Sequence, residues 1–184
     1  MTLLIFGLVL WWAAHLFKRI APGARERLGS KGYQMNALLI LFSVVLMVLG
    51  YRNADGPIYW SRNTALVGIN NLLMVLAFYC YASSAAKDVK IWLGRKLRHP
   101  QLTGFSIWAV AHLLVNGDLP SFILFGGLLI WALVEIVVIN TQEGAWTPAP
   151  AAPVKKEVTA VVVTGIIVCV VMAIHYALGV QPWG

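Results

Sequence analysis

Six runs of apolar residues, separated by short polar linkers, dominate the chain. They cover residues 2–17, 33–51, 64–83, 102–115, 121–141 and 158–179. A helix needs about 20 apolar residues to cross roughly 30 Å of hydrocarbon, and the runs are of that order. The fourth run is the shortest, so its helix is expected to begin earlier, inside the preceding "RHPQ" stretch. The pattern predicts an all-α, polytopic membrane bundle of about six transmembrane helices.

The basic residues between these runs predict the orientation of the bundle. Twelve of the 14 Lys and Arg residues lie in the linkers 18–32, 84–101 and 142–157, whereas only Arg52 and Arg62 lie in the other linkers. Because basic linkers stay in the cytoplasm, both termini are expected outside. The net charge of +7 then reflects topology and contact with anionic membrane lipids rather than binding of nucleic acid.

Composition supports the membrane interpretation. Hydrophobic residues make up 60% of the chain and charged residues only 11%, whereas soluble domains carry about a quarter charged residues. Cys80 and Cys169 lie inside apolar runs without metal-ligand spacing, so they predict neither a disulfide framework nor a zinc site. The first run has no basic residues before it, which favours a retained helix over a cleaved signal peptide.

The linkers divide the chain into three parts. Residues 1–141 form a five-helix membrane domain, residues 142–157 form an extended Pro/Ala-rich cytoplasmic linker, and residues 158–184 hold a last helix that is expected to pack less closely. Within the first part, apolar residues fall on one helical side near 86–97 among basic ones. That spacing predicts a short amphipathic helix on the membrane surface.

Ionisable residues occur inside the apolar runs, where they usually face the bundle interior and mark function. At 1.5 Å per residue, His15 and Glu135 share a level about 5 to 8 Å from the cytoplasmic interface, so they could pair. His112 lies near the midplane, about 10 Å deeper than His15. Each histidine could equally be an interhelical hydrogen-bond partner, and His175, beside Tyr176 at a helix end, is expected to be interfacial.

Residues spaced four apart form one stripe on each of two neighbouring helices. The stripes consist of Gly104, Trp108, His112 and Asn116, and of Gly127, Trp131 and Glu135. They could enclose a flat pocket closed by indoles, or they could simply pack a tight helical hairpin. The pattern favours neither interpretation.

Two stretches resemble a known family. "RHPQLTGFSIWAVAHLLVNGDLPSFILFGG", which begins at Arg98, and "HLFKRIAPGARERLGSKGYQ", which begins at His15, resemble the NnrU family of bacterial membrane proteins. The resemblance covers roughly residues 1–140. The family is related to the 15-cis-zeta-carotene isomerases of plants and cyanobacteria.

The resemblance implies a protein of the bacterial inner membrane that acts in denitrification, in the production of active nitric oxide reductase. The related isomerases use haem b held by membrane histidines. Carried over, this implies His15 and His112 as haem ligands, with His99 in reserve, provided that the two ligands reach a similar depth. The residues proposed to support this site are Glu135, as a hydrogen-bond acceptor for His15, together with Trp108, Trp131 and Asn116.

Three functions remain open. The first is a haem-b membrane protein that serves a nitrogen-oxide enzyme system. The second is an enzyme, a haem-dependent cis–trans isomerase of an apolar polyene. The third is a cofactor-free membrane scaffold, in which the histidines and Glu135 serve as interhelical contacts or a proton path.

Overall fold

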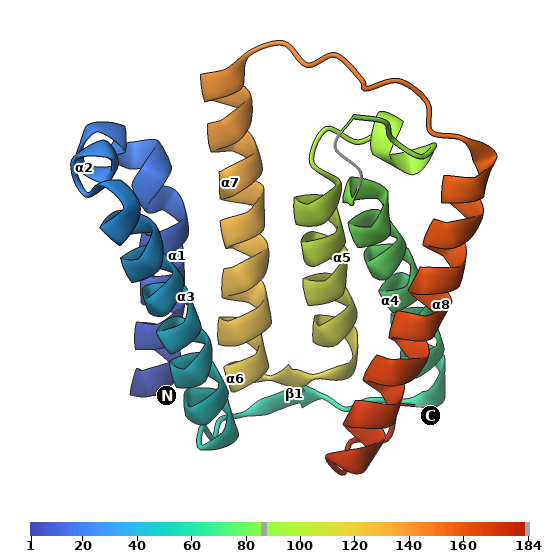
Figure 1. Ribbon diagram of the computed structural model, residues 1–184. Helices are drawn as coiled ribbons and strands as arrows, with labels where there is room; N and C mark the ends of the chain where they lie inside the picture. Colours follow the sequence, from blue (N-terminus) through green and yellow to red (C-terminus); the bar gives the residue numbers. More distant parts are fainter. Residues whose placement is uncertain (86–87, 183–184) are drawn as a thin grey trace.

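Long helices standing side by side make up almost the whole molecule (Figure 1). The computed structural model describes residues 1–85 and 88–182. The long helices are α1 (Thr2–Ile20), α3 (Gly29–Arg52), α4 (Thr64–Ser84), α5 (Pro100–Val115), α7 (Gly127–Glu143) and α8 (Val154–Ala177). The helical turn α6 (Leu119–Ser121) and the π-helical turn η2 (Phe122–Gly126) lead directly into α7, and α2 (Pro22–Arg27) is short. The predicted all-α membrane-type fold is confirmed.

The helix lengths match the apolar runs closely. Within the described residues, five helical stretches are long and apolar enough to cross a membrane, and Leu119–Glu143 is one of them. The sixth, α5, has 16 residues and is shorter than a typical span. It begins at Pro100, inside the predicted stretch. Proline suits the first position of a helix, because an N–H at that position would have no partner within the helix. The last helix begins at Val154, four residues earlier than predicted.

The two ends of the bundle differ in charge. Figure 1 shows α2, the segment 88–99 and the linker 144–153 at one end, which we call the basic end. The N-terminus and the chain after α8 lie at the opposite end. There, β1 (Ile58–Trp60) pairs antiparallel with β2 (Gly117–Asp118). The fold thus groups the three basic linkers, as the charge pattern requires.

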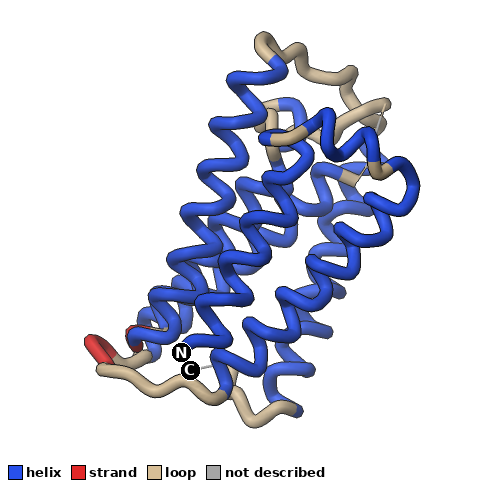
Figure 2. Tube along the Cα trace, turned by 90° about the vertical axis from the view of Figure 1, so that its left-hand side faces the viewer, coloured by secondary structure: helices blue, strands red, loops and turns tan. Residues whose placement is uncertain are grey.

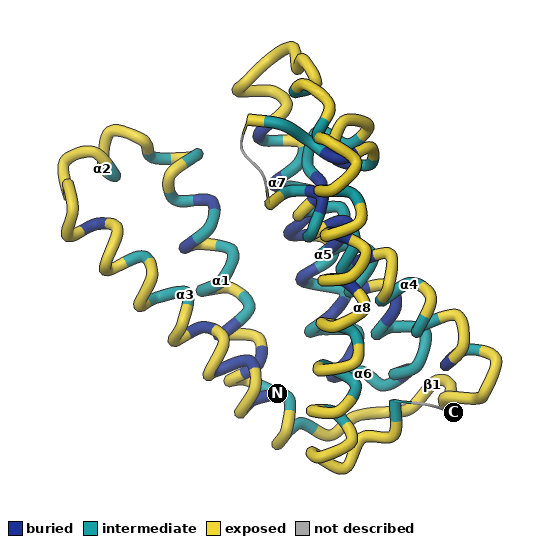
Figure 3. Tube along the Cα trace, turned by 45° about the vertical axis from the view of Figure 1, so that its right-hand side comes forward, coloured by how far each residue is buried: buried dark blue, intermediate teal, exposed yellow. Residues whose placement is uncertain are grey.

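The helices form two groups with α7 between them. α1 packs along α3, while α5 packs between α4 and α7, and α8 lies against α4 (Figure 1). Figure 2 shows the long helices running side by side. A core of Leu4, Met47 and Leu128 joins α1, α3 and α7. Large apolar side chains such as Phe6, Leu41 and Ile166 are exposed. Figure 3 shows that exposed positions, in yellow, recur along all the long helices. This is the arrangement of a bundle that faces lipid.

The prediction of a surface helix near 86–97 is wrong for the residues of this stretch that the structure describes. Residues 88–97 contain only the 3-10 turn η1 (Leu93–Arg95), and residues 86 and 87 lie outside the described part. The backbone of Lys90 instead exchanges hydrogen bonds of 2.9 Å with Pro150 and Ala152 of the linker. Because this bridge satisfies backbone groups that a helix would otherwise pair, the segment stays irregular. The linker is therefore docked on this segment rather than hanging free.

Candidate functional site: an intramembrane cavity with two histidines

A cavity of about 530 Å³ lies between α4, α5 and α8, towards the end opposite the basic end. His112 of α5 and His175 of α8 both line it, although 63 residues separate them in the chain. Its walls are mainly aliphatic and aromatic, with Val75, Phe78 and Met172 among them. The docking of α8 against α4 brings the second histidine to the cavity.

Both imidazoles present the same nitrogen for binding. His112 Nδ1 lies 2.9 Å from the carbonyl oxygen of Trp108, and His175 Nδ1 lies 2.8 Å from that of Val171. A carbonyl oxygen can only accept, so Nδ1 carries the proton in each ring. In the neutral rings Nε2 then has a free lone pair, which is the state that a metal ligand needs.

Aromatic rings fix the orientation of His112. Its ring centroid lies 4.8 Å from that of Trp108 and 4.6 Å from that of Phe125. Phe125 reaches this position from the π-helical turn η2, where the extra residue per turn changes the direction of the side chains. Asn116 donates a hydrogen bond of 2.8 Å to the carbonyl of His112 and also lines the cavity. The predicted supporting residues Trp108 and Asn116 therefore belong to this cavity.

Polar groups gather where the C-terminal segment meets the cavity. Asn71 donates a hydrogen bond of 3.0 Å to the carbonyl of Pro182, and Asn70 donates one of 3.1 Å to the side chain of Asn71. The Arg62 guanidinium donates to the carbonyl of Gln181. These carbonyls carry no formal charge, and none of the described residues that line the cavity is acidic.

His15 lies elsewhere, between α1 and α7. Its Nδ1 is 2.9 Å from the carbonyl oxygen of Trp11, and its ring centroid lies 4.7 Å from that of Trp131. Phe105 stands between Trp131 and Trp108, with centroid distances of 5.2 and 5.0 Å. Since aromatic rings fill the path from His15 to the cavity, the structure does not bring His15 and His112 to one site. Trp131 belongs with His15.

Glu135 is buried one turn after Trp131 and has a relative exposure of 5%. Among the described residues, its Oε2 has no hydrogen-bond partner. Within the residues that the structure describes, no hydrogen bond joins Glu135 to His15, whose Nδ1 instead faces the Trp11 carbonyl. The indole nitrogens of Trp11 and Trp131 are likewise buried without a partner in the described part of the chain.

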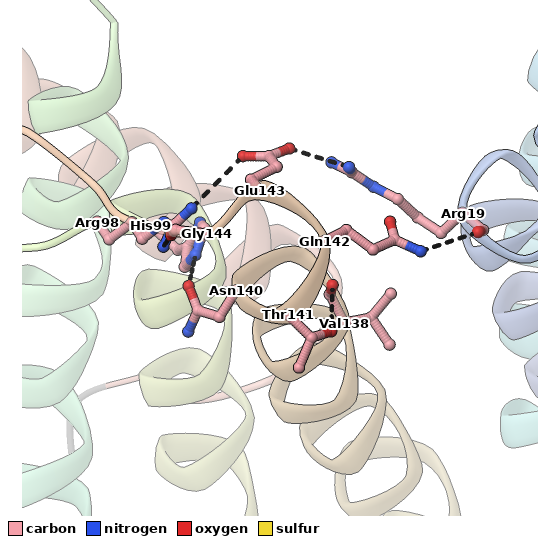
Figure 4. A network of polar contacts seen from close by, with 9 residues as sticks. All are labelled: Arg19, Arg98, His99, Val138, Asn140, Thr141, Gln142, Glu143 and Gly144. Atoms are coloured by element: carbon pink, nitrogen blue, oxygen red, sulfur yellow. Dashed lines mark hydrogen bonds and ion pairs between the residues drawn. The ribbon is translucent and has the colours of Figure 1, made fainter.

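His99 lies at the basic end, outside the cavity that His112 and His175 line. Its Nε2 is 2.9 Å from Asn140 Oδ1, which ties the start of α5 to α7 (Figure 4). Beside it, Glu143 bridges Arg19 at 2.9 Å and Arg98 at 3.8 Å. Within residues 1–85 and 88–182, no three His, Cys, Asp or Glu side chains gather to hold a metal ion.

Sequence reasoning placed His175 at the interface and did not associate it with His112 in one cavity. One signal was available: His112 and His175 both lie within one helical turn of the end of their helix, at Val115 and Ala177 respectively. Both helices end opposite the basic end. Counting from these ends would have placed the two histidines at neighbouring levels.

Comparison with known proteins extends the resemblance. The family model described as "NnrU protein" matches residues 3–182 and so includes the linker and the last helix. No curated protein and no solved structure gives a significant match to the chain.

Proposed function

Because the chain belongs to the NnrU family of membrane proteins, we propose that it is a haem-b protein of the bacterial inner membrane with a role in nitrogen-oxide metabolism. One observation carries the proposal. His112 and His175, from different helices, line one intramembrane cavity. Each has its Nδ1 proton engaged, and among the described residues neither Nε2 has a hydrogen-bond partner.

The cavity suits the chemistry of haem b in three respects. Its volume of about 530 Å³ lies in the range of about 300 to 1,000 Å³ typical of ligand pockets. Its apolar walls would contact the porphyrin, and His112 and His175 would hold the iron. Arg62, with the amides of Asn70 and Asn71, would bind the propionates.

Haem held in this way supplies reversible one-electron redox chemistry. The protein would contribute orientation and exclusion of water. The carbonyls of Trp108 and Val171 keep each imidazole in the Nδ1–H tautomer, and stacking against Phe125 limits rotation of the His112 ring. This assignment replaces the ligand pair of His15 and His112 by His112 and His175, because aromatic side chains separate His15 from the cavity.

The test is an absorption spectrum of the detergent-purified chain, oxidised and then reduced with dithionite. We expect a haem b spectrum that His112→Ala and His175→Ala each change strongly. His15→Ala is the matched control, because it removes an imidazole with the same backbone hydrogen bond outside the cavity, and its spectrum should remain that of the wild type.

Two outcomes would contradict the proposal. A spectrum changed by His15→Ala but not by His175→Ala would assign the ligands to His15 and His112. Protein that stays colourless when haem is supplied, with unchanged helix content, would favour the cofactor-free scaffold.

The apolar lining favours one second candidate, a haem-dependent cis–trans isomerase of a polyene. Val75, Val168 and Met172 give the cavity an aliphatic wall beside the imidazoles, which an apolar chain could contact. This function requires turnover of a cis polyene by the reduced protein only. Full haem occupancy without such turnover would exclude the isomerase function and support the redox role only.

A further inference from the structure

A second cavity, of about 360 Å³, lies at the basic end. Its walls come from the end of α4, the segment 90–97, the start of α5, α7 and the docked linker. Lys90, Arg98 and His99 line it, and none of its described lining residues is acidic. Leu102, Ile139 and other apolar side chains form the remaining wall. A cavity that combines cations with an apolar wall fits an anionic, amphipathic ligand.

The cations of this cavity are held in place without being neutralised. Lys90 Nζ donates to the carbonyl of Ser84 at 2.7 Å, and Arg98 donates to the carbonyl of Gly144. These acceptors carry no formal charge, so they fix the side chains without neutralising them.

Within the described residues, Glu143 is the acidic residue that forms an ion pair with a cation of this cavity, and it shares its charge with a second cation. Its carboxylate is half exposed and lies 3.8 Å from Arg98, but it also bonds Arg19 at the shorter distance of 2.9 Å (Figure 4). One carboxylate thus serves two guanidinium groups, and Lys90 has no acidic partner within the described residues. The surplus of positive charge remains inside the cavity.

We propose that this cavity binds a phosphate group bearing net negative charge, carried either by the headgroup of an anionic phospholipid or by a soluble molecule. Arg98 and Lys90 would contact the phosphate oxygens, because a guanidinium and an ammonium are the side chains best suited to them. Trp146, which is partly exposed beside the cavity, would lie at the level of the headgroups, where indoles gather. The proposal does not depend on haem.

The test uses the full chain in detergent and measures binding of fluorescently labelled phosphatidylglycerol. We expect Lys90→Gln with Arg98→Gln to weaken binding about 30-fold, since each cation near anionic lipid contributes a factor of about five. The matched control, Arg27→Gln with Lys31→Gln, removes the same charge from exposed positions at the same end and should bind as the wild type does.

A second variant guards against misfolding of the first. Gln101→Glu places a carboxylate at the cavity wall with almost no change in shape, and in the described part of the chain the Gln101 side chain makes no hydrogen bond that would be lost. It should also weaken binding, at unchanged helix content by circular dichroism.

Competition identifies the source of the phosphate. Displacement of the probe by inorganic phosphate would indicate a soluble ligand, and resistance to phosphate would indicate the lipid headgroup. Equal displacement by phosphatidylcholine, which has no net charge, would overturn the proposal. Wild-type affinity in both Gln101→Glu and the Lys90/Arg98 variant would overturn it as well, and so would an equal loss in the control.

Discussion

The contact between α1 and α3 can be tested by adding one methyl group to a glycine at the point where the two helices meet. Gly50 of α3 faces the backbone of α1, and a Cβ built on it would lie 2.7 Å from the Cα of Leu4. The obstacle is main chain, which cannot rotate away as a flexible side chain can. Gly50→Ala must therefore push the two helices apart or bend one of them.

The size of the effect follows from two opposing terms. Overpacking by one methyl group costs about 1 to 3 kcal/mol, whereas replacing Gly by Ala inside a helix stabilises it by up to about 1 kcal/mol. Gly165 of α8 has no atom within 4 Å of its built Cβ. Gly165→Ala therefore shows only the gain in helix stability, without overpacking. We expect Gly50→Ala to be about 1 to 3 kcal/mol less stable than Gly165→Ala.

The assay is unfolding in mixed micelles with increasing dodecyl sulfate, followed by far-ultraviolet circular dichroism. Gly7→Ala should behave like Gly50→Ala, because its Cβ would lie 2.8 Å from the backbone nitrogen of Met47. Equal stability of the Gly50→Ala and Gly165→Ala variants would refute the close approach of α1 and α3.

Two further predictions concern polar contacts at the two ends of the bundle. Ser121, fully buried, links the Tyr51 hydroxyl at 2.8 Å to the Asp118 carboxylate at 2.9 Å. Ser121→Ala should therefore lower the unfolding free energy by about 1 to 3 kcal/mol in the same assay, and a neutral result would mean that the link is absent. At the basic end Glu143 is half exposed beside Arg19, so Glu143→Gln should cost less than about 1 kcal/mol. A larger loss of unfolding free energy would show that this ion pair is shielded from water.

The span pattern was predictable because the membrane imposes it. Every backbone polar group in lipid must be paired within its own segment. An apolar run of suitable length in this chain therefore forms a helix. The starts of α4 and α5 were also encoded locally. The Asn63 side chain accepts a hydrogen bond of 3.0 Å from the Leu66 N–H, and Pro100 begins α5.

The segment 88–97 could not be predicted in the same way, because its structure depends on a distant partner. Its apolar residues do have helical spacing, but the Lys90 backbone pairs with Pro150 and Ala152 of the linker. Local periodicity carries no information about a bridge between segments 60 residues apart. The same bridge closes the basic cavity, so that cavity was invisible to sequence reasoning as well.

The two-histidine cavity depended on which helices are neighbours, and depth alone could not decide that. The depth estimate separated His15 from His112, and in the structure the rings of Trp131, Phe105 and Trp108 lie between them. It could not say that α8 packs against α4 and so carries His175 to the wall opposite α5. Two histidines that each lie within a turn of a helix end, at the same end of the bundle, are a pattern worth testing together. A double variant, His112→Ala with His175→Ala, should retain less haem than either single variant, because each single variant keeps one of the two proposed imidazole ligands. Haem retention in the double variant equal to that of His112→Ala alone would mean that His175 does not hold the iron.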